Sequence, residues 1–166
     1  MFASILVAVA LWVPSAQTGT LTFTKPAAWT ARAAASSMRI AEFVVPKASG
    51  DAEDGEVIVY YFGGGGGSVE ANLQRWLTQV QSTKEPTRTT ATVNGLKLTS
   101  LDITGTYVAE MRPGSTEHLS KPGYRMRATV VETPKGPYFI KLTGPAKTID
   151  TAGAAFDQFL QSLNFK

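Results

Sequence analysis

The segment from Glu56 to Phe62, with the sequence EVIVYYF, constrains the fold most strongly, because apolar residues occupy both of its alternating sets of positions. Successive side chains of a strand point to opposite faces of a sheet, so a strand of this kind is buried on both faces. We therefore expect a central strand covered on both sides. The predicted class is α+β, an antiparallel β-sheet flanked by helices on both faces as an α/β/α sandwich.

Two helices are predicted on either side of a run of hairpins. Residues 68–81 carry an apolar stripe at helical spacing, and Ser68 is a favourable N-cap for them. The stripe consists of Val69, Leu73, Trp76, Leu77 and Val80. Residues 145–165 are expected to form one long helix that ends the domain. Its apolar side consists of Ile149, Ala152, Phe156, Phe159, Leu160 and Leu163.

The remaining segments predict strands. Asn94 and Gly95 separate two β-rich runs, which is a strong signal for a tight hairpin. Residues 124–132 and 138–144 form a second hairpin across the sequence TPKGP. Further strands are expected at 21–24 and at 36–45, where Pro46 ends the pattern.

Length and composition limit the class of protein. The chain has 166 residues, enough for one domain, which we place at 17–166. Cysteine is absent and the net charge of +3 is spread along the chain, which excludes disulfides and thiolate metal sites and disfavours nucleic-acid binding. No metal, cofactor or nucleic-acid partner is predicted.

Residues 1–16, MFASILVAVALWVPSA, are uncharged and mostly apolar. The apolar stretch is the length of a signal-peptide core and too short to span a membrane. We expect a signal peptide, export to the periplasm or beyond, and no transmembrane span once the leader is removed. A retained anchor and a buried first helix are the alternatives.

Five consecutive glycines, at positions 63–67, join the central strand to the first helix. No lysine follows them as a phosphate-binding Walker loop requires, and Ser68 occupies the third-glycine position of a dinucleotide fingerprint. One interpretation is an anion site on the backbone amides near Gly66, Gly67 and Ser68 at the helix N-terminus. The other is that the glycines only permit left-handed turns and close packing of helix on sheet.

Polar side chains follow this loop at Asn72, Arg75 and Gln79. Their spacing of three and then four residues places them on one polar stripe of the predicted helix. Together with the glycine loop, this stripe is the predicted binding site. An ordinary solvated helix face is the alternative.

Two other polar segments are weaker candidates. The acids Asp51, Glu53, Asp54 and Glu56 do not have the spacing of a calcium loop, so we expect a solvated loop. His118, the single histidine, stands beside Glu117 in a loop that also contains serines. A hydrolase that uses His118 with a carboxylate is a rival hypothesis, but neighbouring residues of one loop do not supply triad geometry.

The C-terminal third resembles the end of the PsbP/Mog1-like superfamily. The resemblance rests on residues 123–165, which give an aromatic-rich strand, a TG turn, a helix and the S-x-x-F tail from Ser162 to Phe165. It implies an antiparallel sheet between helices and a binding role in place of catalysis. Plant members assist a photosystem, and Mog1-like members bind a small GTPase.

These observations predict an exported, non-enzymatic binding or accessory protein whose partner is a protein. The alternatives are a carrier of small anions at the helix N-terminus and the hydrolase that uses His118.

Overall fold

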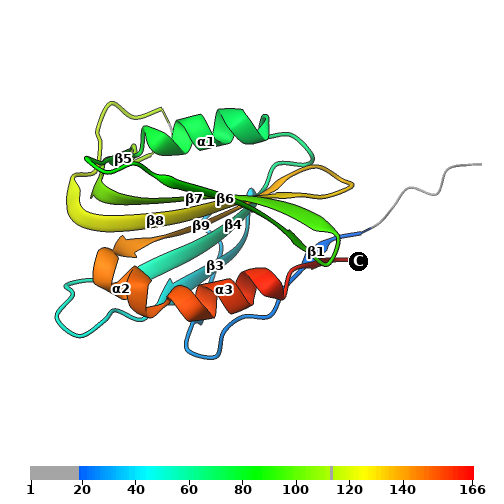
Figure 1. Cartoon of the computed structure of the whole chain (residues 1–166), viewed down its shortest axis with the longest axis horizontal. Helices are drawn as coiled ribbons and strands as arrows, with labels where there is room; N and C mark the ends of the chain where they lie inside the picture. Colours follow the sequence, from blue (N-terminus) through cyan, green and yellow to red (C-terminus); the bar gives the residue numbers. More distant parts are fainter. Residues whose placement is uncertain (1–18, 113) are drawn as a thin grey trace, which may run out of the picture.

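The computed structural model describes residues 19–112 and 114–166, so the predicted leader at 1–16 lies outside the described residues. Within them, an eight-stranded sheet has the order β2-β3-β4-β9-β8-β7-β5, with β6 also paired to β7 (Figure 1). Its strands are β2 (Thr30–Arg32), β3 (Arg39–Val45), β4 (Gly55–Tyr61), β5 (Val80–Gln81), β6 (Thr87–Val93), β7 (Leu96–Tyr107), β8 (Lys121–Glu132) and β9 (Tyr138–Pro145). Every pairing is antiparallel, which confirms the predicted α+β class with an antiparallel sheet.

Three helices accompany the described sheet: α1 (Val69–Leu77), α2 (Ala146–Thr151) and α3 (Gly153–Gln161). Figure 1 shows α1 on one side of the sheet and α2 with α3 on the other. The central strand β4 lies between β3 and β9, as expected, and contributes to both sides. Val57 and Val59 pack with the residues of α2 and α3, whereas Tyr60 packs at the edge of the cluster beneath α1.

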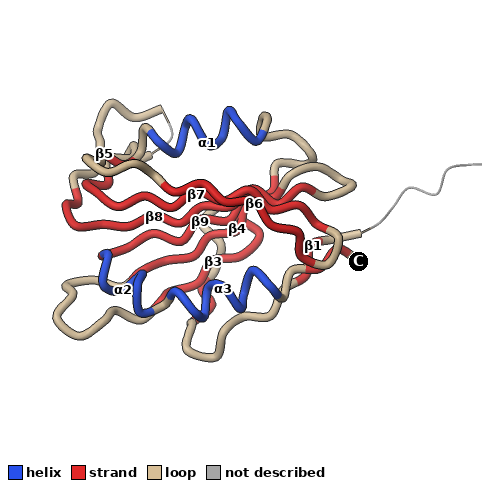
Figure 2. Tube along the Cα trace, in the orientation of Figure 1, coloured by secondary structure: helices blue, strands red, loops and turns tan. Residues whose placement is uncertain are grey.

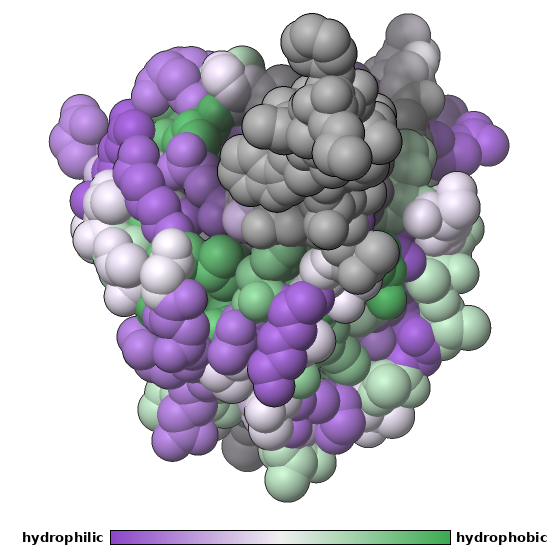
Figure 3. Space-filling view, turned by 90° about the vertical axis from the view of Figure 1, so that its right-hand side faces the viewer, coloured by the Kyte–Doolittle hydropathy of each residue, from purple (hydrophilic) through white to green (hydrophobic). Residues whose placement is uncertain are grey.

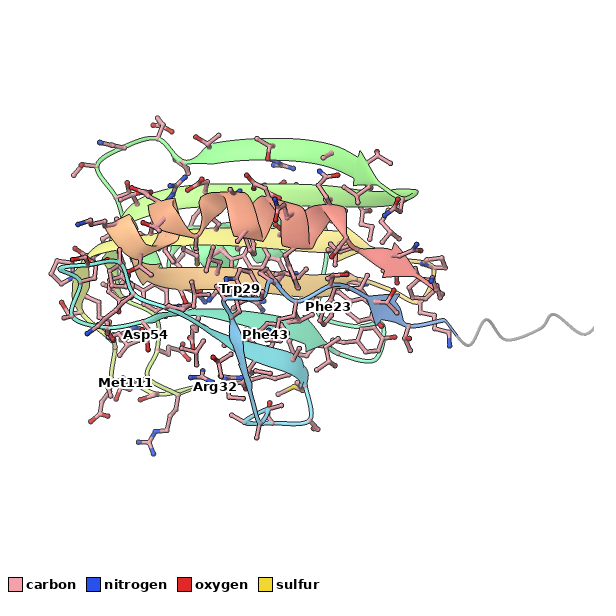
Figure 4. All side chains as sticks on the ribbon, turned by 90° about the horizontal axis from the view of Figure 1, so that it is seen from below. Phe23, Trp29, Arg32, Phe43, Asp54 and Met111 are labelled. Carbon is pink, nitrogen blue, oxygen red and sulfur yellow. The ribbon has the colours of Figure 1, made fainter. Side chains whose placement is uncertain are left out.

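The side under α2 and α3 is a closed aromatic core. The ring of Phe159 lies 5.4 Å from that of Trp29 and 5.1 Å from that of Phe23, measured between centroids. Phe43 and Phe156 complete the group. Figure 4 shows Phe23, Trp29 and Phe43 close together beside the C-terminal helix. The side under α1 is smaller, with Leu73 and Trp76 packed on residues of β7, β8 and β9.

The predicted hairpins are confirmed. Asn94 and Gly95 form the β6–β7 turn with φ of 48° and 80°, the left-handed conformation that a tight two-residue hairpin needs. The β8–β9 hairpin turns through residues 133–137.

The first helix is shorter than predicted. It ends at Leu77, and Val80 belongs to β5, opposite Tyr107 of β7. The hydroxyl of Thr78 donates to the carbonyl of Arg75, and the amide of Val108 donates to the carbonyl of Gln79, so the chain leaves the helix and joins the sheet. The periodic pattern to residue 81 was misleading because Val80 is equally buried in a strand.

The predicted C-terminal helix is two helices, with the break at Ala152. Gly153 is a weak helix former, and Arg127 of β8 donates to its carbonyl oxygen. The end of the predicted helix is a strand, β10 (Asn164–Phe165), which pairs with β1 (Leu21–Thr22) in a separate two-stranded ribbon. Figure 2 shows this ribbon at the edge of the main sheet. The short strand β2 was also not predicted.

Candidate functional site

The glycine loop is packed against its neighbours in a way that explains its composition. Gly66 has a φ of 103°, and a Cβ there would lie 2.6 Å from the ring of Phe139. A Cβ on Gly136, in the β8–β9 turn, would lie 2.5 Å from the Cα of Gly64. Both distances are too short for a side chain, so these glycines allow close packing of the loop on the sheet.

Ser68 and Asn72 fasten this loop to α1. The hydroxyl of Ser68 accepts a hydrogen bond from the amide of Ala71 at 3.1 Å, as an N-cap does. Asn72 is buried, and its side-chain amide donates to the carbonyls of Gly66 at 2.8 Å and Ser68 at 2.9 Å. Its oxygen accepts a hydrogen bond from Arg75. Gly66, Gly67, Ser68 and Asn72 thus form a joint between loop and helix, and their role in binding stays a prediction.

Asn72 and Arg75 share one face of α1, where they are hydrogen-bonded to each other, but the predicted stripe does not continue to Gln79. Asn72 is buried, and Gln79 follows the end of the helix. The side-chain oxygen of Gln79 accepts a hydrogen bond from Nζ of Lys141 on β9 at 2.6 Å. Gln79 is therefore directed at the sheet, beside the exposed Arg75.

Lys141 is a partly buried lysine in the middle of the sheet. It pairs with Ile58 of β4 and Ala128 of β8, and its ammonium also donates to the hydroxyl of Tyr107 at 3.4 Å. Among the described residues it forms no ion pair with a carboxylate. Burial lowers the pKa of Lys141 to about 8, and the charges of Arg75 and Arg39 act in the same direction while Glu56 opposes them.

The sheet next to Lys141, formed by β2, β3 and β4 on the side of α1, carries charged side chains; we call it the polar half-face. Glu42 is buried there and accepts hydrogen bonds from Arg32 at 2.9 Å, Arg39 at 3.1 Å and the amide of Ala35 at 2.7 Å. Desolvation raises the pKa of Glu42, but these donors together hold it below its usual value. Arg32 also binds Glu56 at 2.5 Å. Both carboxylates of the polar half-face are therefore paired with guanidinium groups, and Arg32 is shared between them.

A hollow of about 320 Å³ lies at the end of the polar half-face. Its lining includes Arg32, Glu56, Thr143 and the stacked rings of Tyr107 and Tyr124, whose centroids are 6.0 Å apart. Thr143 is two residues from Lys141 on the same strand, so both side chains are on one face of the sheet. Figure 4 shows Arg32, Asp54 and Met111 at this side of the molecule.

A larger hollow, of about 720 Å³, lies at the other end, where Gly19 and Phe165 contribute to its lining. Figure 3 shows that end of the molecule, with hydrophobic patches between hydrophilic side chains.

The acidic loop has structural partners. Asp51 accepts hydrogen bonds from the amide and hydroxyl of Thr148 in α2, at 2.9 and 2.5 Å. Glu53 pairs with Lys121 at 2.5 Å, and Asp54 accepts from the amide of Lys47 at 2.9 Å. Within residues 19–112 and 114–166, no group of three or more potential ligands is placed to hold a metal ion.

His118 is exposed, and its Nδ1 lies 2.9 Å from the carbonyl oxygen of Val108. The structure does not bring a serine hydroxyl or a carboxylate into hydrogen-bond contact with this ring in the described part of the chain. Catalysis by His118 stays a prediction without a supporting contact.

Sequence reasoning missed Lys141. The available signal was a single charged residue in the strand sequence YFIKLTG, whose alternation places Phe139 and Lys141 on the same face. That face was expected to be covered, so a lysine there needed an explanation.

Comparison with solved structures shows a PsbP-like fold. One similar structure is PA94 from Pseudomonas aeruginosa, a protein of unknown function described as a putative regulator. It has a TM-score of 0.52 and 17% identity, with 87% of this chain and 96% of that chain covered. Another is the cyanobacterial PsbP (CyanoP) of Synechocystis sp. PCC 6803, with a TM-score of 0.50, 13% identity and coverage of 88% and 92%.

The fold expected from the C-terminal third is thereby confirmed. No family model and no curated protein matches the sequence. In the described part of the chain, none of the helices has the length and apolar character needed to cross a membrane.

Proposed function

We propose that this chain is an exported, non-enzymatic binding protein that holds a protein partner on the polar half-face. The observation that carries the proposal is the incomplete cover of the α1 side of the sheet. Leu73 and Trp76 of α1 pack on β7, β8 and Phe139, whereas β2, β3 and β4 carry ion pairs in place of a helix. Export rests on the apolar sequence of residues 1–16.

The surroundings of the polar half-face fit a protein partner. Ile40 and Met38, at the start of β3, have 44% and 48% of their surface exposed, and Met111 has 56% exposed. Large exposed apolar side chains next to arginines are typical of protein interfaces. We further infer that the layers seen in Figure 1 form the α/β/α sandwich of the PsbP/Mog1-like superfamily.

The test is site-specific photo-crosslinking with the full chain. A photoreactive residue replaces Ile40 on the polar half-face or, as a matched control, the exposed Gln158 on α3. In an extract of the source organism, the Ile40 position should give one discrete adduct, and Arg75→Ala should weaken it. Equal adducts from both positions, or none from Ile40, would overturn the assignment of the face.

The non-enzymatic part of the proposal is tested separately. A panel of hydrolase substrates should give no turnover with the full chain. A hydrolase activity that His118→Ala abolishes would instead establish the rival hypothesis.

A further inference from the structure

The ammonium of Lys141 has unused bonding capacity. A lysine ammonium carries three N–H donors. One is directed to Gln79 at 2.6 Å and one, at the longer distance of 3.4 Å, to the hydroxyl of Tyr107. Both acceptors are neutral, so the positive charge of Lys141 has no direct counter-charge among the described residues.

The nearby carboxylates are already engaged. Glu56 is bound to Arg32 and Glu42 to both Arg32 and Arg39. Arg75, whose charge acts on Lys141, forms no ion pair in the described part of the chain and is held by Asn72. A partly buried cation beside a second cation is unfavourable unless an anion joins them.

An aromatic ring next to the Lys141 ammonium provides a surface on which a flat ligand can stack. The ring of Tyr107 lies beneath Nζ of Lys141, with 5.6 Å between Nζ and the ring centroid. The other wall of the nearby hollow is Tyr124, stacked on Tyr107. Tyr107 therefore both lines the hollow and contacts the ammonium of Lys141.

We propose that Lys141 binds a carboxylate group, with Arg75 as the supporting cation and Tyr107 as the wall. This inference rests on the proposed binding function and names the chemistry that the polar half-face recognises. A single remaining N–H donor and one guanidinium whose charge acts on Lys141 suit a monoanion.

Benzoate is the probe, and benzamide is its neutral counterpart of the same shape. Lysine labelled at Cε reports on Lys141 by NMR in the full chain. Benzoate should shift the Lys141 signal with saturation and raise its pKa, because a bound anion favours the ammonium. Benzamide should leave the signal unchanged. An equal response to both compounds, or no response to benzoate, would overturn the proposal.

Three variants sharpen this result. Lys141→Gln keeps a polar side chain without charge and should weaken benzoate binding about tenfold or more, whereas Lys141→Arg should keep it within a few-fold. The control is Lys135→Gln, at an exposed lysine of the β8–β9 turn, which should bind as the wild type does. Unchanged affinity in Lys141→Gln would overturn the assignment even if that variant is fully folded.

The pH dependence gives a signature that a structural role would not produce. Because the pKa of Lys141 is about 8, the wild type should lose at least about tenfold in benzoate affinity between pH 7 and pH 9.5. Lys141→Arg should lose little over this range. Parallel profiles for the two proteins would contradict the role of Lys141.

Two peptides distinguish the source of the carboxylate. Acetyl-Gly-Gly-Phe is tested with a free C-terminal carboxylate and as its amide. Tighter binding of the acid form than of benzoate indicates a carboxylate of a protein partner; binding of benzoate alone indicates a small free acid. If neither acid binds while the Ile40 adduct persists, the carboxylate site is overturned and the proposed function stands.

Discussion

The two faces of the sheet are built on opposite principles. Under α2 and α3, the described residues form a closed core of aromatic and aliphatic side chains, in which Phe159 and Val59 have no exposed surface. On the α1 side, the half formed by β2, β3 and β4 is covered by arginines and glutamates. The comparison separates a face that is stabilised by apolar burial from a half-face that is held together by ion pairs.

Substitutions in the aromatic core under α2 and α3 should lower the free energy of unfolding most. Phe159→Ala removes a ring in contact with Phe23, Trp29 and Phe43, and should lower the free energy of unfolding by about 3–5 kcal/mol. Arg39→Ala on the polar half-face should cost about 1 kcal/mol, because Glu42 keeps Arg32 and the Ala35 amide. Urea denaturation measures both, and equal losses would remove the distinction between the faces.

The glycine loop is the next test, since it supports the α1 side. Gly66→Ala meets both a φ of 103° and the ring of Phe139, so we expect a loss of about 2–4 kcal/mol. Gly63→Ala is the matched control, because Gly63 also has a positive φ but no atom within 4 Å of the added Cβ. Similar thermal stability of the two variants would show that close packing against Phe139 is not the reason for a glycine at position 66.

Asn72 and Arg75 were predicted as one site, and stability measurements can separate them. Asn72→Ala removes the side-chain donor to the carbonyls of Gly66 and Ser68, of which Ser68 keeps the backbone amide of residue 72, and should cost about 1–3 kcal/mol. Arg75→Ala, at an exposed position, removes only the hydrogen bond to the Asn72 oxygen and should cost about 1 kcal/mol at most. The same loss for both variants in urea would contradict the structural role of Asn72.

The last change in stability has the opposite sign. Lys141→Met replaces a partly buried cation by an apolar side chain of similar volume, and should raise the free energy of unfolding at pH 7 by about 1–2 kcal/mol. The folded pKa of about 8 lies below the usual 10.5, so the unfolded state binds more protons between these values. Wild-type stability should therefore rise from pH 8 to 10.5, and the advantage of the Met variant should disappear.

Urea curves at a series of pH values measure this convergence, with Lys135→Met as the control at an exposed lysine. A Met variant that is less stable at pH 7 would show that Lys141 contributes to the fold and would weaken the division between the two faces.

Local sequence signals were sufficient for the sheet. Residues 56–62 revealed the central strand because both faces are apolar, and Asn94-Gly95 revealed a hairpin because few other pairs adopt its backbone angles. The helix ends were wrong because tertiary pairing decides them. Val80 continues the apolar stripe but pairs with Tyr107, and Phe165 leaves the predicted helix to pair with Leu21.

The candidate site could be predicted only in part. Arg75 and Gln79 were identified from their helical spacing. Gln79 nevertheless lies beyond the end of α1, where its side chain contacts Lys141 of the sheet. Lys141 forms hydrogen bonds with Gln79 and Tyr107, which precede it in the sequence by 62 and 34 residues. Only the order of the strands brings these residues together, and that order is not encoded in any local pattern.

The β1–β10 ribbon has a mechanical consequence. The amide of Thr20 donates to the carbonyl of Lys166, the amide of Lys166 donates back, and Leu21 pairs with Phe165. A force applied before Gly19 and after Lys166 would therefore load these hydrogen bonds one after another, as in a zipper, and not all at once. The ribbon would peel first at low force, and the eight-stranded sheet would bear tension only after Leu21 and Phe165 had separated.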